Sequence, residues 1–367
     1  MGRVIEKGKI SAAQSAMMLY LGIVPTAILT TPAITYKFAK QDLWISPIWA
    51  ISAWITIFIA FRFHHMYPGL NIVQASEQIV GRVLGKLIGF ILPFFYLYLN
   101  GIVIREYGEF LVGAFLHQTP LIVVTGSMVL VCALAVRGGV EIVGRFAQLF
   151  LPAFVALFLF IILTIIPDLN PLYMLPIMEG GILPSIAGAG VLQSWFSEFL
   201  TVSFLLPFVT DREKAAKSTM ISLFAVILTL VISNLATLLL LGEMTGNYTY
   251  PFLILARYIS LADFFTHLES LYMAIWVLGA FVKICLFFYV SVLGTAQWLD
   301  LSDYRPLVFP LGFLLMLLSI WVAPNLQELT HAISTTVTIS LIAVFVAFPV
   351  FLFCMAWVKK RLGRNMG

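Results

Sequence analysis

Long apolar stretches separated by short polar segments run along almost the whole chain. A helix satisfies its backbone hydrogen bonds within one segment, as lipid requires, and crossing a hydrocarbon core of about 30 Å takes roughly 20 residues. Ten stretches have about this length, and they cover residues 11–39, 44–66, 87–116, 121–136, 142–166, 182–209, 215–241, 270–298, 306–323 and 329–358. The pattern therefore predicts an all-α polytopic membrane protein, a single transmembrane domain over residues 1–367 with both termini on one side.

Composition supports the same class. Hydrophobic residues make up 61% of the chain and charged residues only 10%, whereas soluble domains carry about 25% charged residues. The loops on the side opposite the termini hold few basic residues, namely Lys37, Lys40 and Arg257, and most others lie on the side of the termini. Because cytoplasmic loops are enriched in lysine and arginine, we expect both termini in the cytoplasm. The net charge of +4 reflects this bias and predicts no nucleic-acid partner.

The first apolar stretch, residues 11–39, contains helix-breaking and polar residues in its middle. Pro25 lacks a backbone N–H and clashes with the carbonyl four residues before it, and Thr26 follows directly. Backbone groups freed in this way cost several kcal/mol each in lipid unless protein or a cavity satisfies them. We therefore expect this helix to be broken at mid-depth and to form half of a ligand site.

The sixth stretch carries interruptions in the corresponding place of a five-plus-five division. Its glycine and polar residues include Gly188, Gly190, Gln193, Ser194, Ser197 and Glu198. Many transporters consist of two inverted repeats with discontinuous helices at mid-membrane. The pattern predicts this arrangement, with repeat one at residues 11–166, repeat two at residues 182–358, and helices 1 and 6 broken.

Five ionisable residues lie inside the predicted spans: Arg105, Glu106, Glu109, Glu198 and Lys283. Each would cost roughly 2.5 to 3.5 kcal/mol or more facing lipid at the bilayer centre, so we expect all of them to face the bundle interior. Arg105 and Glu109 are four residues apart and can pair along one helix face, whereas Glu106 points elsewhere. Lys283 needs a partner from another helix, either Glu198 or carbonyls exposed by the break in the first helix.

Two roles are open for Lys283. A buried lysine is a compact charge that can lose its proton, so it could replace a coupling sodium ion as a fixed or proton-switchable charge. Alternatively, it forms a static ion pair between helices. For Arg105 and Glu109 we favour a structural role, in which the pair fixes the third span to its neighbours.

Two segments between spans carry amphipathic patterns. Residues 74–87 place apolar side chains on one stripe with Arg82 and Lys86 elsewhere, which predicts an interfacial helix. The longest outer loop, residues 242–268, contains a second amphipathic stretch from Tyr250 to Phe264. That stretch is either a lid over an outer vestibule or a helix packed on the surface.

No residue pattern predicts catalysis or a prosthetic group. The five histidines lie at the ends of predicted spans, too scattered to pair a nucleophile with a base or to hold a metal ion. Cys132, Cys285 and Cys354 sit singly in apolar runs, which gives neither a metal spacing nor a disulfide pattern. We expect no enzymatic activity, no cofactor and no metal site.

Several motifs taken together resemble the spore germination protein family. They are, in chain order, KIS followed by Gln14, PTAILTTP in the first span, YPGLNIVQASEQIVGRVLGK after the second, the Arg105 and Glu106 pair, RGGVEIVGRF before the fifth, and YISLADFFTHLES with WVLGAFVK around the eighth. The likeness extends over essentially the whole chain at matching spacing. The family comprises the polytopic B subunits of the nutrient germinant receptors of endospore-forming Bacilli and Clostridia, and is related to the amino acid, polyamine and organocation transporter superfamily.

The resemblance implies a leucine-transporter-like fold, residence in the spore inner membrane with both termini on the spore core side, and A and C receptor subunits as partners. It also implies a site for an amino acid or other small nutrient at the broken helices. The family's first break commonly contains Gly-Ala-Gly, whereas this chain has Pro25, Thr26 and Ala27 there. Because proline cannot donate a hydrogen bond, the amides of Thr26, Ala27 and Ile28 would bind a carboxylate.

An amino acid would then lie between the first, third, sixth and eighth spans. Its carboxylate would meet the amides that begin the second half of span one, where the helix dipole favours anions. Its ammonium group would meet carbonyls near Val24 and Gln193, or the carboxylate of Glu198. The predicted ligand set is Val24, Pro25, Thr26, Ala27, Ile28, Tyr98, Leu99, Gln193, Ser194, Phe196, Ser197, Glu198 and Val282.

Three functions are compatible with these features. As a receptor subunit, the protein would convert nutrient occupancy into a signal; as a secondary transporter, it would carry an amino acid with a proton or a sodium ion. Both require conformational populations that the ligand biases. As an ion-channel subunit, it would line a pore with Arg105, Glu106 and Glu109. The family resemblance favours the receptor.

Overall fold

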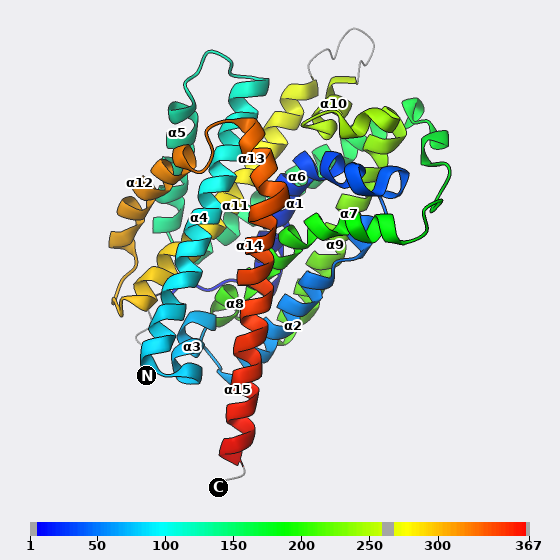
Figure 1. Cartoon of the computed structure of the whole chain (residues 1–367). Coiled ribbons are helices and arrows are strands. Elements are labelled where there is room, and N and C mark those ends of the chain that lie inside the picture. The colour runs from blue at the N-terminus through cyan, green and yellow to red at the C-terminus, as the bar shows by residue number, and fades with distance from the viewer. Residues whose placement is uncertain (1–5, 259–267, 365–367) are drawn as a thin grey trace.

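The computed structural model describes residues 6–258 and 268–364, which form a bundle of long helices (Figure 1). Eight helices in these residues are long and apolar enough to cross a membrane, and two shorter apolar helices, Leu121–Arg137 and Arg305–Trp321, occupy the remaining predicted spans. The hydropathy pattern therefore located every span. The spans are α1 (Ala12–Ala39), α2 (Ile51–Met66), α4 (Arg82–Ala114), α5 (Leu121–Arg137), α6 (Val140–Ile165), α7 (Leu183–Ser197) with its continuation to Phe208, α9 (Arg212–Leu241), α11 (Leu268–Trp298), α12 (Arg305–Trp321), and α13 to α15 (Leu326–Arg364).

Short helices fill the connections between the spans. The α-helical ones are α3 (Ile72–Val80) and α10 (Pro251–Tyr258), and the 3₁₀ turns are η1 (Lys40–Asp42), η2 (Ser46–Ile48), η3 (Ile166–Asp168), η4 (Pro171–Met174) and η7 (Gly242–Gly246). Figure 1 places α3 and the last turns of α15 at one end of the bundle, and α10 and α13 at the other. We call these the α3 end and the α10 end. Lys359 near the end of α15 donates to the carbonyl of Gln78 in α3, which fixes the two elements together.

Helix α1 lies at the centre of the bundle. It packs against α6, α7, α9 and α11. In its most apolar segment of 18 residues, 94% of the residues are buried. By contrast, only 22% of the residues in the most apolar 18-residue segment of α6 are buried, as expected for a helix whose outer face meets lipid. Because α1 is enclosed by protein on nearly all sides, its polar and proline residues are screened from the membrane.

A short segment before α1 ties the bundle together at the α3 end. Ile10 forms an isolated parallel bridge with Val209, donating to the carbonyl of Phe208 over 3.1 Å and accepting from Thr210 over 3.0 Å. The amide of Ala12 donates to Asp211 Oδ1 over 2.7 Å. The start of α1 is therefore held beside the connection between the sixth and seventh spans.

The prediction that helix 1 is broken is wrong. Helix α1 is continuous from Ala12 to Ala39 with Pro25 and Pro32 inside it. The ring of Pro25 packs onto Gly279 of α11, where a Cβ atom would lie only 2.3 Å from Pro25 Cγ, and Trp276 Nε1 donates to the Pro25 carbonyl over 2.8 Å. Neighbouring helices thus accommodate the proline, as membrane helices permit when protein surrounds them.

The sixth span does change its helix type in the predicted region. Helix α7 ends at Ser197, a 3₁₀ turn η5 spans Glu198–Thr201, and a short α-helix α8 (Val202–Leu205) precedes a second 3₁₀ turn, η6 (Leu206–Phe208). The predicted break is therefore a change of winding that begins at Glu198, and the chain stays helical through it. A 3₁₀ stretch inside a helix is often found at functional hinges.

The two amphipathic segments also differ from their predicted bounds. The helix predicted over residues 74–87 is divided at Gly81, whose φ of +87° is unfavourable for residues with a side chain, so α3 ends at Val80 and α4 begins at Arg82. In the outer loop, α10 buries Phe252 and Leu255, which agrees with a helix packed on the surface. Residues 259–267 of the predicted stretch lie outside the described residues.

Candidate functional site

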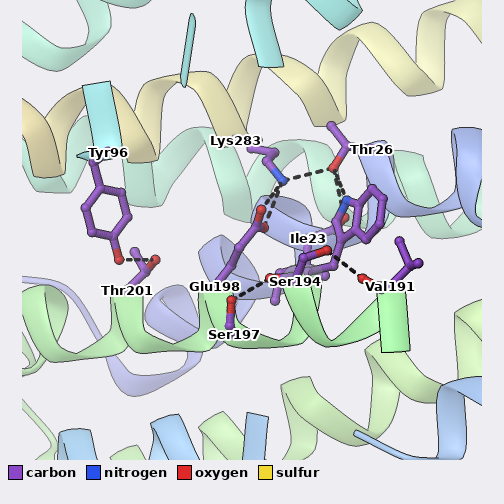
Figure 2. Close-up of polar contacts among 10 residues, drawn as sticks. Ile23, Thr26, Tyr96, Val191, Ser194, Ser197, Glu198, Thr201 and Lys283 are labelled. Carbon is purple, nitrogen blue, oxygen red and sulfur yellow. Dashed lines mark hydrogen bonds and ion pairs between the residues drawn. The ribbon is translucent and has the colours of Figure 1, made fainter. Parts of the chain in front are cut away.

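An ion pair lies at the middle of the bundle between the sixth and eighth spans. Lys283 Nζ of α11 lies 2.8 Å from Glu198 Oε2 and 3.0 Å from Glu198 Oε1, and the two side chains are 1% and 4% exposed. Figure 2 shows both groups directed toward each other from opposite helices. The predicted need of Lys283 for a partner from another helix is therefore met by Glu198.

Thr26 of α1 completes the cluster. Its hydroxyl oxygen accepts a hydrogen bond from Lys283 Nζ over 2.9 Å (Figure 2) and a second one from Trp195 Nε1 over 3.1 Å. Lys283 also lies 5.1 Å from the ring centroid of Phe287, a favourable distance for a cation and an aromatic face. Side chains from the first, sixth and eighth spans thus meet at one buried ammonium group.

A small cavity adjoins this cluster. Its volume is about 30 Å³, which suits about one water molecule and is far below the roughly 300 to 1,000 Å³ of typical ligand pockets. The lining residues are Thr26, Leu99, Ile102, Val103, Glu106, Ser194, Trp195, Glu198, Lys283, Ile333, Val337 and Leu341. Of the predicted ligand set, Thr26, Leu99, Ser194 and Glu198 are among them.

Glu106 of α4 is the second acidic residue that lines the cavity. Its side chain is buried at 4% exposure, and no hydrogen-bond partner for its Oε1 atom lies within the described residues. A buried polar atom without a partner carries a desolvation cost that a bound group could relieve. The cavity is thus lined by two carboxyl groups and one ammonium group, and one of the carboxyl groups has an oxygen available.

The other predicted residues of α1 do not line the cavity. Val24, Pro25, Ala27 and Ile28 are buried within the helix packing. Because α1 is continuous, the amides of residues 26 to 28 lie inside a regular helix and bond to carbonyls four residues earlier. The predicted carboxylate site at a broken first helix is therefore not formed.

The polar groups of the other predicted residues of the sixth span are satisfied within the protein, and of these residues only Ser194 lines the cavity. Gln193 Oε1 accepts from the Ser52 amide over 2.9 Å, and the Gln193 carbonyl accepts from the Ser52 hydroxyl over 2.8 Å, so the predicted ammonium site there is occupied. Ser194 and Ser197 turn their hydroxyls back onto carbonyls of their own helix, as Figure 2 shows. Phe196 is buried and does not line the cavity.

Two predicted selectivity residues also lie elsewhere. Tyr98 is half-buried beside Phe95, with ring centroids 6.1 Å apart. Val282 is buried in α11 next to the cluster but is absent from the cavity lining. Of the predicted selectivity positions in the third and eighth spans, only Leu99 contacts the cavity.

Arg105 and Glu109 form the predicted pair, with Arg105 Nη2 at 2.8 Å from Glu109 Oε1. The guanidinium also donates to the carbonyls of Ile320 over 3.1 Å and Pro324 over 3.2 Å. Ile320 lies in the last turn of α12, where a helix leaves carbonyl acceptors unpaired, and Pro324 lies in the segment that follows this helix. The pair therefore fixes α4 to the end of α12, in agreement with its structural interpretation, and Arg105 and Glu109 do not line the cavity.

The tenth span forms an apolar wall of the cavity that the sequence did not predict. Ile333, Val337 and Leu341 follow each other at intervals of four residues along this span and face the cavity. The first two bound a π-helical turn, η8 (Ile333–Val337), which is followed by α14 (Thr338–Ile342) and a second π turn, η9 (Ala343–Ala347), before α15 (Phe348–Arg364). Such widened turns occur often at functional sites. The span is apolar on several faces, so hydropathy did not distinguish its inner face.

Ile102, Val103 and Trp195 were missed as well. The first two could have been found from their spacing, because they lie three and four residues before Glu106 on one helix face. No cluster of three or more potential metal ligands occurs in the described residues. Polar and charged side chains of α1, α4, α7 and α11 around an interior cavity make a site that can recognise a small charged molecule.

Comparison with known structures defines the fold. A nucleobase-cation-symport-1 family transporter, Mhp1, solved in a closed conformation with bromovinylhydantoin bound, is similar with a TM-score of 0.67 and 11% sequence identity, covering 96% of this chain and 79% of that chain. The fold is therefore leucine-transporter-like, and the chain is a polytopic membrane protein with a charged cavity buried among its spans.

Sequence comparison then gives the family. Residues 9–327 match the family described as spore germination protein, and the chain belongs to this family. It is 27% identical to spore germination protein KB of Bacillus subtilis (strain 168), over 99% of both chains. It is 24% identical to spore germination protein YndE of the same strain, over 96% of this chain and 98% of that protein. The resemblance inferred from the motifs is thus confirmed.

Proposed function

We propose that this chain is the B subunit of a nutrient germinant receptor, and that a small amino acid bound beside Glu106, Glu198 and Lys283 triggers spore germination together with A and C subunits. The observation that carries the proposal is the meeting of three buried ionisable side chains at one cavity in the middle of the bundle. Ionisable groups at membrane depth are costly and commonly mark ligand or ion pathways. Membership of the spore germination protein family supports the biological role.

The charges of the cavity suggest how a zwitterion binds. Glu198 is already neutralised by Lys283, whereas Glu106 has an unpartnered oxygen. The ammonium group of the amino acid would therefore donate to Glu106. Its carboxylate would accept from Lys283, whose other acceptors are the Glu198 carboxylate and the Thr26 hydroxyl. The sequence predicted backbone amides for the carboxylate and either backbone carbonyls or Glu198 for the ammonium group, whereas this arrangement uses Lys283 and Glu106.

Binding an amino acid requires the cavity to enlarge, because its volume is about 30 Å³. We propose that the tenth span moves. It contributes Ile333, Val337 and Leu341 to the wall, and its two π turns interrupt the regular hydrogen-bond pattern. Displacement of this span on binding would convert occupancy into a conformational signal that partner subunits could read, provided that the ligand binds the open form more tightly.

The variant Glu106→Gln tests the proposal in spores that carry the A and C subunits. We expect loss of the amino acid response, since an uncharged amide attracts an ammonium group less strongly than a carboxylate does. Glu328→Gln is the matched control, because Glu328 is exposed in the first turn of α13. Immunoblots of the inner membrane establish equal amounts of each variant. A normal response of Glu106→Gln spores would refute the binding mode.

We further propose that the α3 end faces the spore core and the α10 end faces outward in the spore inner membrane. The excess of lysine and arginine in the segments that join the spans at the α3 end supports this orientation, because basic residues are retained on the cytoplasmic side. In a variant that lacks the three native cysteines, Lys40→Cys should react with a membrane-impermeant maleimide and Arg145→Cys should not. The opposite labelling would reverse the orientation.

A secondary amino acid transporter coupled to protons or sodium is the alternative. The similar structure is that of a transporter, and Lys283 supplies a buried positive charge where a coupling cation could otherwise lie. Proteoliposomes containing this chain alone would accumulate labelled amino acid under an ion gradient if it transports. A response only in the presence of A and C subunits supports sensing.

A further inference from the structure

A groove at the α3 end opens on the surface of the bundle between the first turns of α4 and the end of α11. Its volume is about 670 Å³. The lining residues are Arg82, Val83, Lys86, Leu87, Phe90 and Trp298. None of them belongs to the cavity at the centre of the bundle, so the groove is a separate feature.

One wall of the groove is apolar and exposed. Val83, Leu87 and Phe90 succeed each other along one face of α4 and are 78%, 59% and 45% exposed. The centroids of the Phe90 and Trp298 rings lie 5.2 Å apart. Trp298 also approaches α4 closely at Gly89, where an added Cβ atom would lie 3.2 Å from Trp298 Cδ1. Large apolar side chains exposed on a membrane helix face acyl chains, and tryptophan concentrates at the level of the headgroups.

The mouth of the groove is basic. Lys86 is engaged by the carboxylates of Asp300 at 2.7 Å and Glu77 at 3.5 Å and by the carbonyl of Trp298, so its charge is balanced locally. Arg82 is exposed and makes no hydrogen bond or ion pair with the residues that the structure describes. The groove thus joins one uncompensated guanidinium to an apolar strip that runs toward the membrane interior.

We propose that this groove binds an anionic phospholipid. The phosphate of the headgroup pairs with Arg82, whose planar guanidinium can bind two phosphate oxygens at once. One acyl chain lies along Val83, Leu87 and Phe90 against Trp298. Basic grooves between membrane helices on the cytoplasmic side are suited to anionic headgroups, and this groove lies on that side in the orientation proposed above. The lipid would bridge α4 and α11, two helices that also carry Glu106 and Lys283.

Quenching of Trp298 fluorescence by lipids with brominated acyl chains tests the site. The purified full chain is placed in phosphatidylcholine nanodiscs that contain increasing fractions of brominated phosphatidylglycerol, and the same series with Trp298→Phe gives the signal of the other tryptophans. We expect quenching at a lower mole fraction for brominated phosphatidylglycerol than for brominated phosphatidylcholine. The midpoint is the mole fraction of brominated phosphatidylglycerol that gives half-maximal quenching. Arg82→Gln should raise this midpoint about fivefold, the effect of removing one basic contact.

Two controls make the result decisive. Lys217→Gln removes an exposed basic residue at the start of α9, away from the groove, and should leave the midpoint unchanged. Soluble glycerol phosphate should not displace the brominated lipid; displacement would mean that the site binds free phosphate groups and would overturn the lipid assignment. Equal midpoints for the two brominated lipids, or for Arg82→Gln and the unchanged chain, would also overturn it.

Discussion

Lys283 and Glu198 depend on each other because each would be an uncompensated charge without its partner. Both are almost fully buried, and removing one partner of such a pair costs about 3 to 5 kcal/mol, whereas replacing both by apolar residues of similar size is often neutral. We predict that Lys283→Met and Glu198→Met each lower the stability of the detergent-solubilised protein by about 3 to 5 kcal/mol. The double variant should recover most of this loss in the same thermal unfolding assay.

The double variant also separates stability from response. It should accumulate in the membrane and yet fail to respond to nutrient, because the ammonium group proposed to bind the ligand carboxylate is gone. If the double variant is as unstable as the sum of the two single variants, the two residues do not act as a pair. If it responds normally, Lys283 has no part in the signal.

At the residue scale, the sequence was informative where a charge must be compensated. The position of Lys283 inside an apolar span required a partner from another helix, and Glu198 was one of two candidates. The spacing of residues 105, 106 and 109 showed that Arg105 and Glu109 can pair on one helix face and that Glu106 points in another direction. Apolar contributors such as Val337 could not be identified, because an apolar residue inside a membrane helix is equally compatible with lipid, core or cavity.

Helix α1 shows how tertiary packing decides whether a proline breaks a helix. The Pro25 ring occupies the space that Gly279 leaves open on α11. This complementarity depends on two residues that are far apart in the sequence, so inspection of the first span alone could not reveal it. The sixth span was predicted more accurately because its change in winding begins at Glu198, the last of the glycine and polar residues from which the break was predicted.

We predict that Gly279→Ala destabilises the protein by about 1 to 3 kcal/mol or more through overpacking, because the new Cβ atom would lie 2.3 Å from Pro25 Cγ. Gly190→Ala is the matched control, since no atom lies within 4 Å of the added methyl group. Thermal unfolding should show the loss for position 279 only. Adding Pro25→Ala should recover stability in Gly279→Ala, and equal stabilities of the two alanine variants would contradict the contact.

The connection between the sixth and seventh spans should make stability depend on pH only in strong acid. The hydrogen bond from the Ala12 amide holds the pKa of Asp211 below its usual value of 3.8. A carboxylate with a lowered pKa contributes stability that is complete above its unfolded pKa and is lost as the pH falls through the folded pKa. We predict that Asp211→Ala lowers the unfolding temperature by a constant amount above about pH 5, and that the difference shrinks as the pH falls from 3.8 toward the lower pKa of the folded protein.

Asp211→Asn is the control for this prediction, because asparagine keeps an oxygen that can accept from Ala12 and does not titrate. It should unfold at a higher temperature than Asp211→Ala. A difference between the unchanged chain and Asp211→Ala that varies between about pH 5 and about pH 8 would show that another group controls the contact.

At the scale of the whole molecule, hydropathy located the spans because lipid exposure demands long apolar helices, and the family motifs indicated the leucine-transporter-like arrangement. The sequence did not predict how tightly the helices close around the centre. The volume of the cavity, about 30 Å³, results from side chains of five spans meeting at once. The proposed amino acid site therefore requires the helices to move apart, and this movement cannot be read from the lining residues alone.

Direct binding to the purified chain, in nanodiscs with A and C subunits, tests the central claim most directly. We predict that at least one small amino acid binds saturably and is displaced by its unlabelled form, that Glu106→Gln abolishes this binding, and that Glu328→Gln leaves it unchanged. Saturable binding that survives Glu106→Gln, or no saturable binding of any amino acid, would contradict the account.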